Sequence, residues 1–143
     1  MNLEFQRLHS DAVLPTAAHA GDAGLDVSAL HGATVAPGER ALIATGFAVA
    51  IPEGHAGLLV PRSGSAIKRG LTLVNSPGLI DAGYRGEVKV AVVNLDPRDT
   101  VEIAAGDRVA QLVVVPVPNT EPTWSDRLPT TSRGDGGFGS TGV

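Results

Sequence analysis

The chain has 143 residues and a formal charge of −4 at neutral pH, so it lacks the basic surface that non-specific nucleic-acid binding requires. Its length suits one domain with one core. The absence of cysteine excludes disulfides, thiolate metal sites and cysteine nucleophiles. No apolar run reaches membrane-spanning length, and the N-terminus lacks a signal-peptide pattern. We therefore expect a soluble, cytoplasmic protein with no nucleic-acid or membrane partner.

The composition favours β-structure, because 18 glycines and 10 prolines separate short, valine-rich apolar runs. These runs predict strands over residues 3–8, 25–30, 41–51, 57–60, 71–74, 87–95 and 108–117. One short helix is predicted over 63–69, where Ser63 can cap and Gly70 can terminate. We expect an all-β antiparallel sandwich or barrel over residues 1–117. Its sheet edges favour self-association.

The chain after the last strand divides by composition into two further parts. Prolines recur through residues 118–132, which predicts an extended linker. Residues 133–143 are rich in glycine, which predicts a flexible C-terminal arm.

Two polar segments interrupt the β pattern early in the chain. Asp26 stands at the start of a predicted strand, in Ala23-Gly24-Leu25-Asp26, where a solvated strand residue is an equally good interpretation. Pro61-Arg62-Ser63-Gly64-Ser65 opens the predicted helix, and free N–H groups at a helix start can receive an anion. A helix cap accounts for Ser63 but leaves Arg62 unexplained.

The third segment, residues 75–87, predicts a β-hairpin that forms a pocket. Its turn signals are Ser76-Pro77-Gly78 and Asp81-Ala82-Gly83, after which strand-like alternation resumes. Asp81 and Tyr84, the chain's only tyrosine, can therefore converge on one small ligand. The simpler interpretation is a turn aspartate that bonds its own backbone.

The last two segments are residues 106–112 and 133–142. Gln111 is the only polar residue between Val109 and Val117, and a buried amide requires partners, either backbone or ligand. The glycine-rich segment lacks the lysine of a phosphate-binding P-loop. Its glycines still allow N–H groups to approach phosphates, while Arg133 and Phe138 offer a cation and a stacking face.

Taken in this order, the five segments resemble the five motifs of the trimeric dUTP diphosphatase (dUTPase) family over residues 23–142, with no departure at the functional positions. The resemblance implies a jelly-roll-like β fold and a homotrimer with active sites at subunit boundaries. It implies hydrolysis of dUTP to dUMP and pyrophosphate with Mg²⁺, which keeps uracil out of DNA and supplies dUMP for dTMP synthesis. The arm, 133–143, would close a neighbouring subunit's site.

The resemblance also implies a role for individual residues. Asp81 is implied as the base that activates water for attack on the α-phosphorus, and an aspartate is ionised near neutral pH. Tyr84 is implied to pack on the deoxyribose and exclude a 2′-hydroxyl. Asn75 and the backbone of residues 78–80 are implied to read uracil. Asp26 is implied to order the phosphate-binding region.

The catalytic residues that the resemblance implies are Asp81, Asp26 and Arg133. The substrate-binding residues are Arg62, Ser63, Gly64, Asn75, Gly78, Leu79, Ile80, Tyr84, Lys89, Gln111, Arg133, Gly137, Phe138, Gly139 and Ser140. Mg²⁺ is implied on phosphate oxygens and waters, with no direct protein ligand.

Three other interpretations stay open. A related dCTP deaminase would need an additional glutamate beside the base, whereas Glu87 follows Tyr-Arg-Gly here as in the diphosphatases. A nucleotide-binding regulator without turnover would not need the intact Asp81 and Arg133. A purely structural β-trimer would explain neither Gln111 nor the glycine-rich tail.

Overall fold

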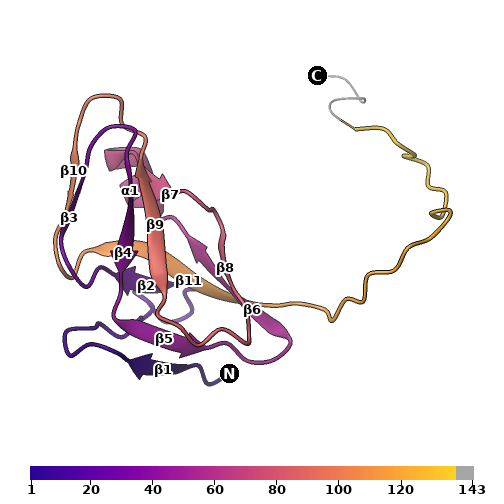
Figure 1. Ribbon diagram of the computed structural model, residues 1–143, viewed down its shortest axis with the longest axis horizontal. Helices are drawn as coiled ribbons and strands as arrows, with labels where there is room; N and C mark the ends of the chain where they lie inside the picture. Colours follow the sequence, from indigo (N-terminus) through magenta and orange to yellow (C-terminus); the bar gives the residue numbers. More distant parts are fainter. Residues whose placement is uncertain (138–143) are drawn as a thin grey trace.

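The computed structural model describes residues 1–137 as a body of short strands with one helix (Figure 1). The elements in chain order are β1 (Glu4–Arg7), β2 (Leu25–Ser28), β3 (Ala33–Val35), β4 (Arg40–Ala44), β5 (Phe47–Ala50), β6 (His55–Val60), α1 (Ser63–Arg69), β7 (Leu71–Leu73), β8 (Gly78–Ile80), β9 (Lys89–Asn94), β10 (Val101–Ile103) and β11 (Arg108–Pro116). The predicted all-β fold with one short helix is confirmed.

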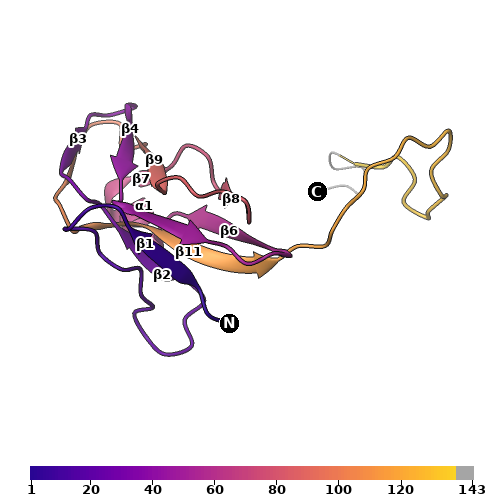
Figure 2. The same ribbon diagram turned by 60° about the horizontal axis from the view of Figure 1, so that its bottom comes forward.

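The described strands form four antiparallel sheets. The two larger sheets have the orders β2-β11-β6-β8 and β4-β9-β7, and the pairs β1-β5 and β3-β10 complete the body (Figures 1 and 2). β11 is the longest strand, and it pairs with β2 on one side and β6 on the other. Residues from distant parts of the chain therefore meet along β11.

The core lies between the sheets and consists largely of β-branched side chains. Along β9 the inward positions alternate with outward ones, so that Val90 and Val92 are fully buried. Burying one such side chain contributes about 1.5–3 kcal/mol. Asn94, also fully buried in β9, donates from Nδ2 to the carbonyl oxygens of Val35 (2.9 Å) and Asp99 (2.8 Å). This amide ties β9 to β3 and to the loop before β10.

The predicted strand over residues 41–51 is wrong, because the structure divides it into β4 and β5. The break is Gly46, whose φ of +74° lies in the left-handed region that favours glycine. β4 then pairs with β9, whereas β5 pairs with β1. One run of apolar residues thus serves two sheets.

Three further strands, β3, β8 and β10, were not predicted. Each has only three residues, which is too short for an alternating pattern to be visible. Each is held by a partner distant in sequence: β3 pairs with β10, and β8 pairs with β6. Long-range pairing, which the local sequence does not encode, therefore defines them.

The helix has the predicted bounds but not the predicted cap. Gly70, with φ of +64°, ends it and donates its N–H to the carbonyl oxygen of Ala66. The N-cap position is occupied by Arg62, which makes no side-chain cap hydrogen bond. Ser63 is already the first helical residue, so the expectation that it caps the helix is wrong.

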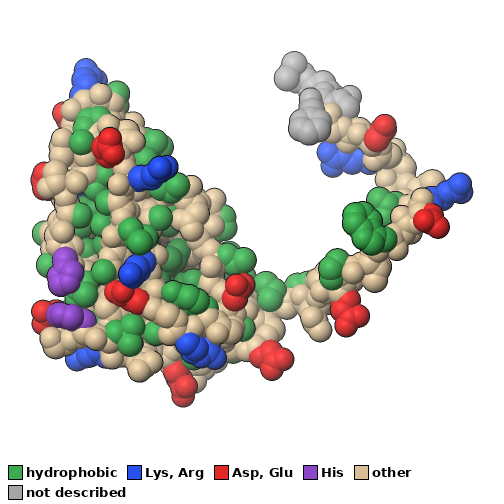
Figure 3. All heavy atoms as spheres, in the orientation of Figure 1, with side chains coloured by type: hydrophobic (Ala, Val, Ile, Leu, Met, Phe, Trp, Pro, Cys, Tyr) green, Lys and Arg blue, Asp and Glu red, His purple; other side chains and the backbone are tan. Residues whose placement is uncertain are grey.

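After β11 the chain leaves the body. Residues 117–137 contain no helix or strand and extend away from the sheets in every view (Figures 1–3). Trp124 in this stretch is fully exposed. Residues 1–137 contain no helix that is long and apolar enough to cross a membrane. The division into a linker and an arm stays a prediction.

Candidate active site

A pocket of about 350 Å³ opens between β8 and the start of β9. The structure brings together here seven residues of the expected substrate site: Asn75, Gly78, Leu79, Ile80, Asp81, Tyr84 and Lys89. Asp81 is exposed, and its carboxylate is available to a ligand. The pocket therefore combines a carboxylate, an amide and an aromatic ring, as expected for residues 75–87.

The path of the chain explains the pocket. β7 and β9 pair antiparallel, so residues 75–87 are the connection of a hairpin. Within that connection the chain crosses to the other large sheet, where β8 pairs with β6 as the outermost strand. The free edge of β8 leaves backbone N–H and C=O groups of residues 78–80 available to a ligand.

Two local features shape the pocket wall. A methyl group at Gly78 would lie 3.2 Å from Nδ2 of Asn75 and 3.3 Å from Cβ of Leu59, so glycine leaves room for the amide. The turn after β8 is closed by the Tyr84 N–H, which donates to the Asp81 carbonyl oxygen (3.0 Å). Asp81 and Tyr84 are thereby held at opposite ends of one turn.

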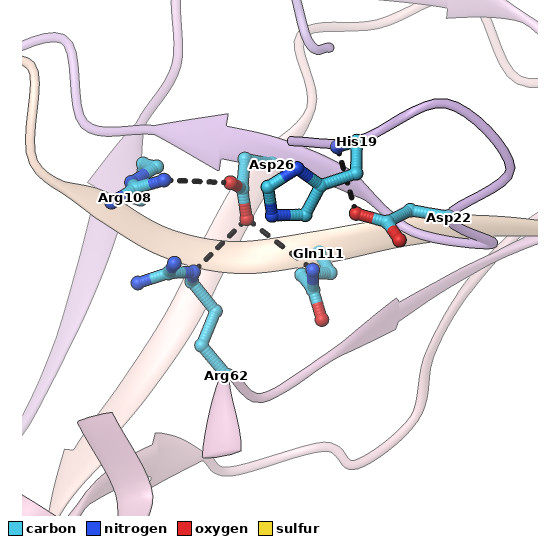
Figure 4. Close-up of polar contacts among 6 residues, drawn as sticks. All are labelled: His19, Asp22, Asp26, Arg62, Arg108 and Gln111. Atoms are coloured by element: carbon cyan, nitrogen blue, oxygen red, sulfur yellow. Dashed lines mark hydrogen bonds and ion pairs between the residues drawn. The ribbon is translucent and has the colours of Figure 1, made fainter. Parts of the chain in front are cut away.

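A second cluster forms around Asp26 (Figure 4). Its carboxylate accepts hydrogen bonds from Arg62 Nε (3.0 Å), Arg108 Nη1 (3.1 Å) and Gln111 Nε2 (3.3 Å). Asp26 is only 8% exposed, so it is not the solvated strand residue that its sequence context allowed. We call Asp26, Arg62, Arg108 and Gln111 the arginine cluster.

Strand register assembles the arginine cluster. Gln111 in β11 stands opposite Asp26 in β2 and opposite Val60 in β6, two residues before Arg62. A methyl group at Gly24 would lie 3.1 Å from Cδ of Gln111, so glycine leaves room for this side chain. The arginine cluster has a net positive charge, because one carboxylate faces two guanidinium groups. This charge favours binding of an anion.

Arg108 is the functional candidate that the sequence interpretation left out of the site. It lies in the Gly106–Leu112 segment, three residues before Gln111, and its side chain is 54% exposed. The sequence feature that could have identified Arg108 is its place, as a cation, in the same polar segment as Gln111. Ser63 and Gly64 are exposed at the start of α1, directly after Arg62.

The pocket and the arginine cluster lie at different ends of the sheet β2-β11-β6-β8: the pocket opens along the free edge of β8, and the cluster is built on β2 and β11. Residues directly opposite each other across a ladder share a face, and neighbours along a strand alternate. Leu59 stands opposite Gly78 and Leu112 on one face, whereas Leu79, which also lines the pocket, stands opposite Leu58 on the face of Val60 and Gln111. In one chain the pocket therefore includes residues from both faces at the β8 edge, while the arginine cluster is centred two strands away.

Of the C-terminal residues expected in the site, the structure describes Arg133 and Gly137, and neither lines the pocket or joins the arginine cluster. Arg133 donates from Nε to the carbonyl oxygen of Gly136 (3.0 Å) within the extended segment. Gly137 is the last residue described. Phe138, Gly139 and Ser140 lie outside the described residues.

The donor set fits a metal carried by substrate rather than by protein. Residues 1–137 contain no group of three histidine, aspartate or glutamate side chains placed to hold an ion. Both carboxylate oxygens of Asp26 are engaged by the arginine cluster. Of the two carboxylates that line the pocket, Glu87 is engaged by the Gly46 N–H and by Lys89, which leaves that of Asp81. Mg²⁺ commonly binds through substrate phosphates and retains several waters, so it fits this arrangement.

Comparison with known proteins identifies the family. A family model described as dUTPase matches residues 10–142. The deoxyuridine 5'-triphosphate nucleotidohydrolase of Mycolicibacterium vanbaalenii is 54% identical over 141 residues, covering 95% of this chain and 92% of that protein. The corresponding Thermobifida fusca protein is 49% identical over 142 residues, covering 99% and 79%.

Solved structures give the same result. A mutant dUTPase of Staphylococcus bacteriophage 80alpha with dUpNHpp has a TM-score of 0.93 at 32% identity, covering 99% of both chains. A mutant dUTPase of the S. aureus phage phi11, described for the coordination of a structural Mg(II) ion, has a TM-score of 0.82 at 31% identity, covering 89% of this chain and 98% of that one. The chain belongs to the dUTPase family, and its fold is the jelly-roll β fold of that family.

Proposed function

We propose that this protein hydrolyses dUTP to dUMP and pyrophosphate, using the pocket for the nucleoside and the arginine cluster for the triphosphate. The observation that carries the proposal is the pocket in which Asn75, Asp81 and Tyr84 meet. It offers an amide and a free strand edge to a base, an aromatic ring to a sugar and a carboxylate to a water. The reaction is that of the family to which the chain belongs.

Each group has a task in this mechanism. The Asp81 carboxylate accepts a proton from a water as that water attacks the α-phosphorus, and pyrophosphate leaves. Arg62, Arg108 and Gln111 oppose the negative charge of the phosphates, while Asp26 fixes the direction of the two guanidinium groups. Lys89 adds a cation at the pocket rim, where it also pairs with Glu87 (3.5 Å).

The base and sugar are selected by shape. Asn75 and the free edge of β8 can pair with uracil, and Leu79 and Ile80 contribute to the same wall. Tyr84 packs on the deoxyribose and leaves no room for a 2′-hydroxyl. When bound through the substrate phosphates and waters, Mg²⁺ would neutralise part of the phosphate charge.

The active protein is proposed to be a homotrimer, since in one chain the pocket at the β8 edge and the arginine cluster on β2 and β11 belong to different ends of one sheet. The face that carries Gln111 continues with apolar side chains that are partly buried or, for Leu79, exposed in a single chain. They are Leu58, Val60, Leu79, Val113 and Val115. A second copy packed on this face would cover them and place its arginine cluster near the first copy's pocket.

The C-terminal segment would complete the site. Residues 118–132 are extended enough to reach another subunit, and Arg133 with Phe138 is proposed to close over the bound nucleotide. Gly137, Gly139 and Ser140 would offer backbone or hydroxyl donors to phosphates. The cytoplasmic location expected from the sequence stays a prediction.

Substrate specificity tests the reaction itself. The full chain is incubated with Mg²⁺ and, separately, dUTP, dCTP, dTTP and UTP, while pyrophosphate and ammonia are measured. We expect pyrophosphate from dUTP alone and no ammonia. Ammonia from dCTP would identify a deaminase, and nucleotide binding without any product would identify a regulator.

Mixed oligomers test the shared site. Asp26→Asn and Asp81→Asn chains are denatured together in equal amounts and refolded, with each variant refolded alone as control. If each site takes Asp81 from one chain and Asp26 from another, random trimers restore about one quarter of the wild-type sites. Activity no higher than that of the separate variants would show that a single chain supplies both residues.

A further inference from the structure

Tyr84 is held in place by more than the pocket. The residue is 45% exposed, yet its hydroxyl donates a hydrogen bond to the Glu87 carbonyl oxygen (2.9 Å). An exposed tyrosine normally samples several rotamers in solvent. Here the hydroxyl bond fixes the direction of the ring across the hairpin connection.

The ring reaches Glu87 by crossing Gly86. A methyl group at residue 86 would lie 2.5 Å from Oη of Tyr84, 2.7 Å from Cζ and 3.1 Å from Cε2. Contacts this short are not tolerated, so any side chain there displaces the ring. Gly86 does not have a positive φ, and so its backbone conformation is open to other residues. The three atoms nearest to a methyl group at this position all belong to Tyr84, so the tyrosine ring accounts for the need for glycine.

The acceptor of the Tyr84 hydroxyl is itself fixed. Three hydrogen bonds join residues 87–88 to the turn between β4 and β5. The Gly46 N–H donates to Oε1 of Glu87 (2.9 Å), and Oγ1 of Thr45 donates to the Val88 carbonyl oxygen (2.6 Å). The Val88 N–H donates to the carbonyl oxygen of Phe47 (2.9 Å). The carbonyl that holds the phenol therefore belongs to a well-anchored piece of backbone.

We infer that Gly86 is a specificity-determining position, which sets the selection of deoxyribose over ribose by letting Tyr84 lie flat across the backbone onto the Glu87 carbonyl. The inference rests on the proposed packing of Tyr84 against the sugar. Gly86 itself touches no substrate and acts through Tyr84, so it is a positioning residue. A side chain at residue 86 lifts the ring and changes the space beside C2′ of the nucleotide.

Gly83 provides a matched control in the same hairpin connection. A methyl group at Gly83 would meet no atom within 4 Å, and its φ is not positive either. Gly83→Ala and Gly86→Ala therefore make the same chemical change three residues apart. Only the second one meets the tyrosine ring.

The position of the ring can be followed without any assay of activity. Because Tyr84 is the only tyrosine in the chain, ¹³C-labelled tyrosine gives ring NMR signals from this residue alone. We expect these signals to shift in Gly86→Ala and to stay at the wild-type position in Gly83→Ala. Unshifted signals in Gly86→Ala, or equal shifts in both variants, would overturn the positioning role.

Kinetics with dUTP and UTP test the effect on specificity. In Gly86→Ala the ratio of kcat/KM for dUTP over UTP should fall by at least about tenfold, the low end of what one group in a pocket contributes. In Gly83→Ala the ratio should not change. Tyr84→Phe, which adds no atom and removes only the bond to Glu87, should lower the ratio in the same direction. An unchanged ratio in Tyr84→Phe would remove the hydroxyl anchor from the explanation.

The Tyr84→Ala variant distinguishes the role of Gly86 from that of Tyr84 itself. If this variant loses discrimination against UTP but Gly86→Ala retains it, the role of Gly86 is wrong and the role of Tyr84 stands. If Tyr84→Ala also retains discrimination, the ring does not select the sugar, and both are wrong. Loss of discrimination in Tyr84→Ala and Gly86→Ala, with Gly83→Ala unaffected, is the result that we expect.

Discussion

Replacing Asp26 by asparagine should disable phosphate binding while leaving the fold intact. The substitution preserves the size of the side chain but removes the negative charge that faces Arg62 and Arg108. An amide that directs its NH₂ group toward a guanidinium loses that hydrogen bond as well. Two cations then face each other without the carboxylate between them, and their directions are no longer fixed.

The structure gives the size of this effect. Arg62 is only 25% exposed, so its bond to Asp26 belongs with hydrogen bonds to charged groups, which contribute about 1.5–3 kcal/mol. Arg108 is 54% exposed, so its ion pair contributes about 0.2–1 kcal/mol. Together they amount to about 2–4 kcal/mol, which corresponds to a loss of about 30-fold to 10³-fold in kcat/KM.

The assay is pyrophosphate release from dUTP at low substrate concentration, with thermal unfolding measured in parallel. Asp22→Asn is the matched control, since its carboxylate lies in the loop before β2, accepts the His19 N–H (2.9 Å) and contacts no arginine within residues 1–137 (Figure 4). We expect wild-type kinetics and unfolding in the control, whereas Asp26→Asn should be folded at the assay temperature but unfold at a lower temperature, because the lost bonds also stabilise the free protein. A kcat/KM for Asp26→Asn within about threefold of wild type would refute the role of the carboxylate.

Three further predictions follow from the site and the core. Asp81→Asn should retain binding of a non-hydrolysable dUTP analogue. Its turnover should fall by about 10²–10⁴-fold, the usual contribution of a positioned general base. Near-normal turnover would exclude Asp81 as the base. Truncation after Ser132 should preserve the unfolding temperature and the sedimentation coefficient of a trimer. Turnover should fall by at least about 10²-fold. Full activity would refute the role of residues 133–143 in closing the active site. Asn94→Ala should lower the free energy of unfolding by about 2–4 kcal/mol in urea, because the buried carbonyl oxygen of Val35 and the more accessible one of Asp99 lose their donor. A change below about 0.5 kcal/mol would contradict that account.

Much of the β fold could be predicted because its longer strands alternate visibly. β9 and β11 carry valine at inward positions, and both were expected within two residues of their observed bounds. The division of residues 41–51 could not be predicted from apolar content. It depends on Gly46, whose positive φ turns the chain from one sheet into another.

The candidate site was accessible from sequence to different degrees. Residues 75–84 are local in the chain, so their convergence on one pocket follows from a single hairpin connection. The arginine cluster is not local: Asp26, Arg62 and Arg108 meet only because β2, β11 and β6 pair in a particular register. Sequence spacing gave no sign that Asp26 would be buried between two arginines.

The turn at Gly46 also links the pocket to the N-terminus. Its carbonyl oxygen accepts the N–H groups of Leu8 (2.8 Å) and His9 (3.1 Å), while its own N–H is held by Glu87. Groups joined in this way open and close together, so we expect the amides of Leu8, Gly46 and Val88 to exchange hydrogen with solvent at similar, slow rates. β1 contributes no residue to the pocket, yet a fusion partner that pulls β1 from its sheet would loosen the backbone on which Tyr84 rests.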